Sequence, residues 1–99
     1  MSPHIVQADY DALALMARQF DQEGQDVETL THRIRLLVED LERGGWKGMG
    51  ARAFYDEMYM DVLPGLRALH DALYAASDAV TQINTIMRNA EEDAAQHFK

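Results

Sequence analysis

The sequence has no cysteine, two prolines and one tryptophan among its 99 residues. The lack of cysteine excludes a disulfide framework, a thiolate zinc site and a thiol nucleophile. A single chain of this length buries only about 60–65% of the surface that its unfolded form exposes. Because no covalent or metal cross-link can compensate, the missing burial is expected from regular helix packing or from a second subunit.

Long apolar runs and positive charge are also scarce. No stretch approaches the roughly 18 apolar residues of a membrane-spanning helix, and the start Met1-Ser2-Pro3-His4 lacks the basic and apolar regions of a cleaved signal peptide. Seventeen acidic residues stand against nine basic ones, which gives a formal charge of −8. This charge repels phosphate backbones and anionic lipids, so neither nucleic acid nor a membrane surface is an expected partner.

The first half of the sequence carries a helical pattern. Asp9 is suited to cap the start of this helix, and Gly44-Gly45 to end it, because glycine adopts a positive φ without a Cβ clash. We therefore predict a first helix over residues 9–42. Gly24 within it indicates close approach by another helix or, alternatively, a hinge. Apolar or small residues recur in steps of four and three at Leu13, Ala17, Phe20, Gly24, Val27, Thr31, Ile34, Val38 and Leu41.

A second helical pattern follows Gly50 and continues at Phe54, Met58, Val62, Leu66, Leu69, Leu73, Ala76, Val80, Ile83, Met87, Ala90 and Ala94. Pro64 lies inside this pattern and removes one backbone hydrogen bond. Because the steps continue unbroken across Pro64, we expect one kinked helix over residues 51–90 rather than two helices. The six methionines lie mostly on the helical stripes and are expected to fill the core.

These patterns predict an all-α fold: one domain over residues 1–99, in which two long antiparallel helices form a hairpin with a turn at 43–50 and a tail at 91–99. With the turn centred near Trp46, residue i faces roughly residue 92 minus i, so the chain after about Asn84 extends beyond the first helix and is free to fray or be recognised. Each apolar stripe is wider than one partner helix covers. Two hairpins are therefore expected to form a four-helix bundle.

The distribution of charge favours one orientation of the two hairpins. Residues 1–30 carry six acidic and one basic residue, residues 31–67 carry six of each, and residues 68–99 carry five acidic and two basic residues. All of the net negative charge thus lies away from the turn, where Arg43, Lys47 and Arg52 cluster. An antiparallel dimer separates the two acidic ends and brings each toward a basic turn.

Residues that could support catalysis or bind a metal are few. The histidines His4, His32, His70 and His97 are scattered, and only Asp93 and His97 have a spacing that could share a cation. The serines have no setting typical of a nucleophile, and the glycines around Lys47 follow no strand and lack the serine or threonine of a phosphate-binding loop. No catalytic site, metal or cofactor is expected, and the protein is not expected to be an enzyme.

Trp46 is the residue most suggestive of a specific role. It is the only tryptophan and lies between glycines in the predicted turn. A large amphipathic ring at that place either closes the open end of the hairpin or is presented to a partner, and the two roles are compatible.

Trp46-Lys47-Gly48, at the middle of a chain of about one hundred residues with two long amphipathic helices, resembles the WXG family of small type VII (ESX) secretion substrates, which is related to the early secreted antigens of mycobacteria. The resemblance covers essentially the whole chain. It implies a helical hairpin that dimerises, leaves the bacterial cell folded without a cleaved signal peptide, and is bound by the FtsK/SpoIIIE-type ATPase of the secretion machine. The dimer partner it implies is a second copy or a paralogous chain, and the self-complementary charges favour a homodimer.

The family also has a Tyr-x-x-x-Asp/Glu signal near the end of the second helix, which lies close to the Trp-x-Gly turn of the partner. Tyr74 and Asp78 have this spacing but stand in the middle of the helix. At the expected place, Met87 and Glu91 retain the acid and replace the tyrosine. Because they are one helical turn apart, they would be presented together as an export signal. The alternative function is an intracellular coiled-coil scaffold or adaptor.

Overall fold

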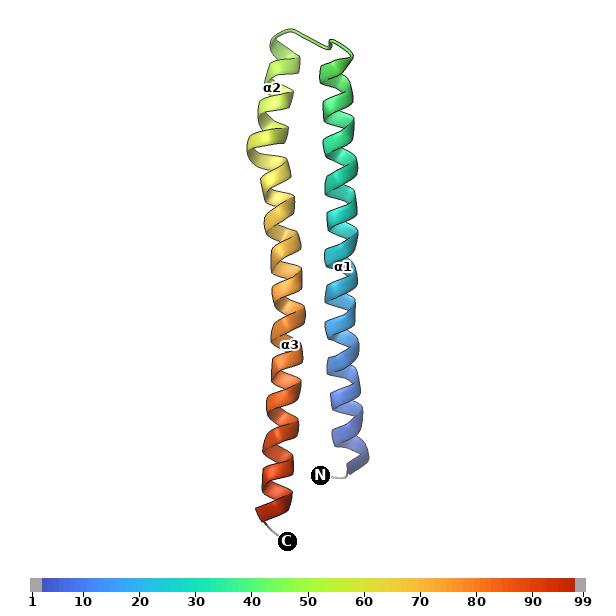
Figure 1. Cartoon of the computed structure of the whole chain (residues 1–99), viewed down its shortest axis with the longest axis vertical. Coiled ribbons are helices and arrows are strands. Elements are labelled where there is room, and N and C mark those ends of the chain that lie inside the picture. Colours follow the sequence, from blue (N-terminus) through green and yellow to red (C-terminus); the bar gives the residue numbers. More distant parts are fainter. Residues whose placement is uncertain (1–2, 98–99) are drawn as a thin grey trace. The chain divides into compact units, whose positions relative to one another are not determined.

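The computed structural model is all-α and describes residues 3–97, with side chains over residues 7–96 (Figure 1). Helix α1 spans Pro3–Arg43 and α2 spans Met49–Glu57. A π-helical segment, η1, covers Met58–Val62 and leads directly into α3, Leu63–His97. The predicted hairpin of two long antiparallel helices is confirmed.

Both helices are longer than the sequence pattern indicated. Helix α1 begins at Pro3, six residues before the predicted start at Asp9, because proline is well suited to the first turn of a helix and no glycine follows until Gly24. Helix α3 runs to His97 through the segment predicted as a tail from residue 91. Neither glycine nor proline occurs after Gly65, so nothing in the sequence stops this helix earlier.

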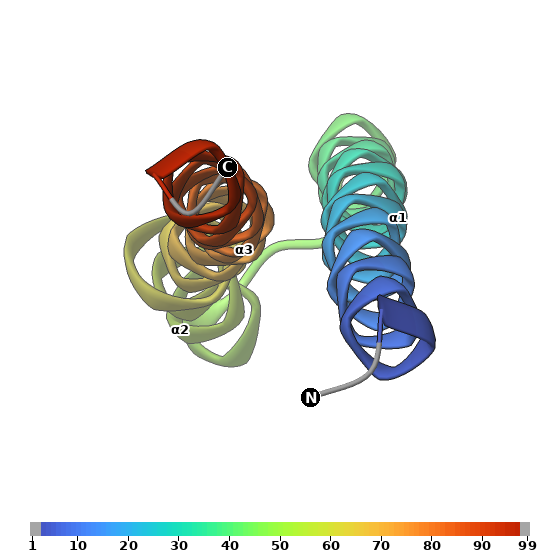
Figure 2. The ribbon, with the colours of Figure 1, turned by 90° about the horizontal axis from the view of Figure 1, so that it is seen from below.

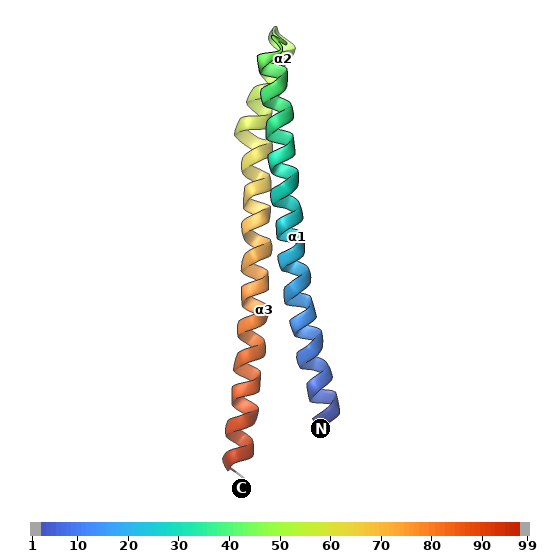
Figure 3. The same ribbon diagram turned by 45° about the vertical axis from the view of Figure 1, so that its right-hand side comes forward.

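The chain divides into two compact units. The terminal unit contains Met1–Gln22 and Leu73–Lys99, and the turn unit contains Glu23–Ala72. In the turn unit, the second half of α1 and the segment from α2 into α3 lie side by side in Figures 1 and 3. Figure 2 shows the connection that crosses from the end of α1 to α2.

Pro64 is accommodated by a widened turn of helix. The Leu63 N–H bonds to the carbonyl of Met58, five residues earlier, instead of four. This π-type spacing lies directly before the residue that lacks an N–H and whose ring would crowd the preceding turn. The helix therefore continues through Pro64 as predicted, and the predicted disturbance takes the form of a π-helical segment over Met58–Val62.

The two helices meet along heptad-spaced residues. On α1, the inner positions Tyr10, Ala17, Gly24 and Val38 are buried. In the terminal unit, the Ser77 Oγ donates a hydrogen bond to the carbonyl of Ala17 at 2.8 Å, and the Asn84 Nδ2 donates one to the carbonyl of Tyr10 at 3.3 Å. These pairs place residue i opposite residue 94 minus i, two residues from the predicted register. Since α1 begins at Pro3, α3 extends beyond the described part of α1 only after about residue 91, not after Asn84.

The helix pair has an apolar side and a polar side. In an antiparallel pair, the positions three and six residues after the inner ones lie on the same side of both helices. On this side, which we call the apolar flank, the turn unit has Leu30, Leu37, Leu41 and Leu69, and the terminal unit has Met16, Ile83 and Met87, all of them exposed. The opposite side is polar and carries the grooves described below. Within residues 3–97, no helix has the length and apolar content needed to cross a membrane.

Candidate functional site

The turn between the helices is built by a Schellman motif at the end of α1. Gly45 has φ 82°, in the left-handed region. Its N–H bonds to the carbonyl of Glu42 at 3.1 Å, and the N–H of Trp46 bonds to the carbonyl of Leu41 at 3.2 Å. These two bonds satisfy helix-terminal carbonyls and fix where Trp46 leaves the helix. The predicted glycine stop is confirmed at Gly45.

Gly48 begins the second helix in a conformation that only glycine adopts readily. Its φ is 115° and its ψ is 179°, and its carbonyl accepts a hydrogen bond from the N–H of Arg52 at 3.0 Å. A Cβ at this φ would be strained although no neighbouring atom lies within 4 Å of its position. The glycine of the Trp-x-Gly tripeptide is therefore required by the backbone, independently of any partner.

Trp46 is anchored on one side and open on the other. Its ring lies 5.4 Å from the ring of Phe54 and 5.6 Å from that of Tyr55, centroid to centroid, and 44% of the residue is exposed. The Tyr55 hydroxyl donates a hydrogen bond to the carbonyl of Trp46 at 2.9 Å. These contacts hold the ring at a defined place while they leave part of it accessible, an arrangement compatible with either role expected from the sequence.

A second tyrosine joins α1 to the helix that follows the turn. The Tyr59 hydroxyl donates a hydrogen bond to the Glu42 carboxylate, and this bond, together with burial, raises the pKa of Tyr59 to about 12. Burial and the same carboxylate raise the pKa of Tyr55. The Tyr59 hydrogen bond joins the helix after the turn to the last turn of α1 and so supports the position of the turn.

The residues of the predicted export signal lie on α3. Met87 is 43% exposed, on the apolar flank, and Glu91 is exposed one turn later. Tyr74 and Asp78, the second match to the family spacing, lie in the middle of α3, where Tyr74 is half-buried and Asp78 is exposed. All four residues belong to the terminal unit, whereas Trp46 belongs to the turn unit.

Glu91 lies in a cluster that the sequence analysis missed. The Arg88 guanidinium is stacked over the ring of Tyr10, 4.7 Å from its centroid. Tyr10, Arg88, Glu91 and Glu92 line one groove of about 330 Å³. Burial raises the pKa of Tyr10 to about 12, and the Glu91 carboxylate adds to the shift. The only available signal for this cluster was the heptad step from Tyr10 to Ala17, which places Tyr10 on the inner face.

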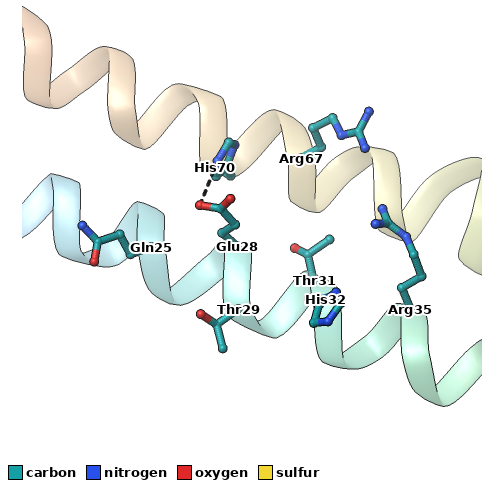
Figure 4. Close-up of a pocket in the computed structure, with 8 residues that line it drawn as sticks. All are labelled: Gln25, Glu28, Thr29, Thr31, His32, Arg35, Arg67 and His70. Carbon is teal, nitrogen blue, oxygen red and sulfur yellow. Dashed lines mark ion pairs between the residues drawn. The ribbon is translucent and has the colours of Figure 1, made fainter.

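One groove on the polar flank belongs to the turn unit. It has a volume of about 640 Å³, and Arg35 of α1 and Arg67 of α3 line it (Figure 4). His70 lies between two carboxylates: its Nε2 is 3.6 Å from Glu28 and its Nδ1 is 2.7 Å from Asp71. Among the described residues, no three histidine, aspartate or glutamate side chains gather to hold a metal ion. The predicted spacing of Asp93 and His97 falls partly outside the described side chains.

Four of the methionines are exposed, so the prediction that the methionines fill the core is wrong for these residues. Met49 is 90% exposed and Met60 is 73% exposed, and Met16 and Met87 are exposed as well. Two helices bury only one strip of each other, so residues on the sides of a wide apolar stripe remain at the surface.

A hairpin of two long helices joined by a Trp-x-Gly turn defines a class of small all-helical proteins. The chain belongs to the WXG100 family, described as proteins of 100 residues with WXG, which it matches over residues 5–92. It is also similar to Protein YukE from Bacillus subtilis (strain 168), with 25% identity over 89 residues that cover 90% of each chain. No solved structure matches the chain at a significant level.

Membership confirms the resemblance predicted from the sequence. WXG100 proteins are non-enzymatic secreted proteins of type VII (ESX) systems, and they typically form dimers. The residues of this chain that would be recognised follow from its geometry and are proposed below.

Proposed function

We propose that this protein is a substrate or secretion partner of a bacterial type VII system, exported as a helical dimer and recognised through its Trp46-x-Gly48 turn and the end of α3. The observation that carries the proposal is the WXG100 match over residues 5–92. The geometry of Trp46 supports it, because an aromatic ring that is held in place and still accessible loses little conformational entropy on binding.

The apolar flank supports the dimer. Leu37 is 64% exposed and Leu30 is 47% exposed in the turn unit, while Ile83 is 50% exposed in the terminal unit. Within the described residues these apolar side chains remain exposed to solvent, so their surface is available to a partner. A second hairpin placed on the apolar flank would bury them and complete a four-helix bundle.

Charge supports the antiparallel orientation and a second copy as the partner. The acidic chain ends would approach the partner's turn, where Lys47 and Arg52 are exposed. In this arrangement Met87, on the apolar flank, approaches the Trp46 of the partner. The turn of one copy and the tail of the other then form one surface for the FtsK/SpoIIIE-type ATPase. A paralogous WXG100 chain is the alternative partner.

Orientation can be measured directly. In a cysteine-free chain, a single cysteine at Lys47 or at Ala90, an exposed residue six positions after the inner residue Asn84 and therefore on the apolar flank, can be introduced without a competing thiol. An antiparallel dimer predicts that a short crosslinker joins a chain carrying Lys47→Cys to one carrying Ala90→Cys, and joins neither variant to itself. Crosslinking of Lys47→Cys to itself would contradict the antiparallel arrangement.

Export is tested by Trp46→Ala with Met49→Ala as the control. Both side chains are exposed close to the turn, and Trp46 packs against Phe54 and Tyr55, whereas Met49 is 90% exposed. In a host with an active type VII system, we expect Trp46→Ala to abolish appearance in the culture medium while size-exclusion chromatography still shows a dimer, and Met49→Ala to be exported. Retention of the unmodified chain in such a host would overturn the proposal. Collapse of the dimer in Trp46→Ala would assign the ring a structural role.

A further inference from the structure

The last turns of α3 are attached to α1 by side chains near the chain termini. Asn84 reaches the carbonyl of Tyr10, and one turn later the Arg88 guanidinium covers the ring of Tyr10 at 4.7 Å. Glu91 lines the same groove one further turn along. Three successive turns of α3 therefore contact or approach one residue of α1.

The opposite directions of α1 and α3 explain why Tyr10 lies near side chains from three successive turns of α3. Helical side chains lean toward the N-terminus of their own helix. In the antiparallel terminal unit, the N-terminal direction of α1 is the C-terminal direction of α3. Tyr10, opposite Asn84, thus leans toward Arg88 and Glu91, while Arg88 leans back toward Tyr10. The two side chains meet, and Tyr10 is 4% exposed as a result.

We propose that Tyr10, Arg88 and Glu91 form a clasp that keeps the end of α3 helical and thereby holds Met87 and Glu91 on one face for recognition. Tyr10 is then a positioning residue for the export signal. The role of Met87 and Glu91 as an export signal rests on the proposed function. The clasp itself does not, because it is a structural arrangement of this chain.

The need for a clasp follows from the length of the free end. After about residue 91, α3 has no described part of α1 beside it. A helical end without tertiary contacts frays, because few of its residues are fixed by packing. Residues 91–96 are all exposed, and the stacking of Arg88 on Tyr10 lies directly before them. If the clasp opens, fraying of this end is expected to reach Glu91 and to loosen its one-turn spacing from Met87.

Amide hydrogen exchange of the purified dimer tests the clasp without reference to export. We expect Tyr10→Ala to lower the protection of the amides of residues 88–96 by about threefold to tenfold, the range of a cation–π contact. Tyr10→Phe keeps the ring under Arg88 and should retain most of the protection. Arg88→Gln should reproduce Tyr10→Ala. Arg33→Gln, an exposed arginine in the turn unit, is the matched control and should change nothing there.

Export then tests the positioning role. Tyr10→Ala and Arg88→Gln should reduce secretion while the dimer persists, and Tyr10→Phe should restore it. Unchanged protection of residues 88–96 in Tyr10→Ala overturns the clasp, whether or not the protein is exported. Reduced protection with full export overturns the positioning role. Failure of the unmodified chain to be exported rejects the proposed function and leaves the exchange result valid.

Discussion

The Ser77 Oγ donates a hydrogen bond of 2.8 Å to the backbone carbonyl of Ala17, sixty residues away in the sequence. A side chain as short as serine reaches a helix backbone only where the two helices approach closely, and the small residue Ala17 allows this approach. Asn84 repeats the contact one heptad further on, at the carbonyl of Tyr10. Together the two bonds set the register of the terminal unit, because a shift of one residue would rotate both donors away from their acceptors.

Loss of the Ser77 contact should be measurable. We expect Ser77→Ala to lower the free energy of unfolding by about 0.5–1 kcal/mol, since the lost hydrogen bond exceeds the small gain in helix propensity. Thr85→Ala removes an exposed bond within α3 itself and should be neutral or slightly stabilising. Urea unfolding followed by circular dichroism measures both. Equal effects of the two substitutions would contradict a role of Ser77 in helix pairing.

Substitution by alanine should change the stability of the protein in opposite directions at two glycines near the turn. Gly48 has φ 115°, where alanine is strained, so Gly48→Ala should destabilise the protein by about 1–3 kcal/mol. Gly50 lies inside α2 with open space around its Cα, so Gly50→Ala should stabilise by about 0.5–1 kcal/mol. Thermal unfolding of the two variants checks the difference in sign. A neutral Gly48→Ala would show that the turn has another accessible conformation.

The proposed dimer interface can be tested at two adjacent leucines of α1, only one of which lies on the apolar flank. Leu37 lies on the apolar flank, whereas Leu36 points away from both the flank and the inner face. We expect Leu37→Glu to raise the dimer Kd about tenfold or more, and Leu36→Glu to leave it nearly unchanged, although both side chains are exposed in the single chain. Analytical ultracentrifugation over a concentration series measures the Kd. Similar effects of the two variants would place the interface elsewhere.

Tyr10 and Tyr59 contribute to the free energy of unfolding, and this contribution falls with pH in the alkaline range. Both have a folded pKa of about 12, above the usual value of 10.0. Their contribution is fully present below about pH 10, where the unfolded tyrosines are protonated, and is lost as the pH rises through about 12. We expect the urea midpoint to fall over this range, and to fall less in Tyr59→Phe. Tyrosinate absorbance should show that Tyr10, Tyr55 and Tyr59 ionise later than a free tyrosine, and normal ionisation of all tyrosines would contradict the contacts described.

Several features could be derived from the sequence because they depend on local chemistry. The spacing of apolar residues in steps of three and four predicted the two helices, and Gly44-Gly45 predicted the end of the first. The lack of cysteine excluded disulfide bonds and thiolate zinc sites. The tripeptide Trp46-Lys47-Gly48 indicated the family only together with the chain length, its central position, the lack of cysteine and of a signal peptide, and the two helical patterns. The buried Gly24 fits the predicted close approach of helices, while a hinge there stays a prediction.

The register and the side-chain clusters were decided only in the tertiary structure. Periodicity shows which face of a helix is buried but not which residue of the other helix lies opposite, so the predicted register was two residues off and the clasp of Tyr10 with Arg88 was missed. The predicted overhang of α3 was too long mainly because α1 begins six residues before the predicted start at Asp9. Pairing across sixty or more residues depends on shape and hydrogen-bond geometry between two helices, and no local pattern encodes it. The sequence by itself determined the helices and the glycines of the turn, and the packing of one helix on the other determined how Trp46 is held and how the end of α3 is attached.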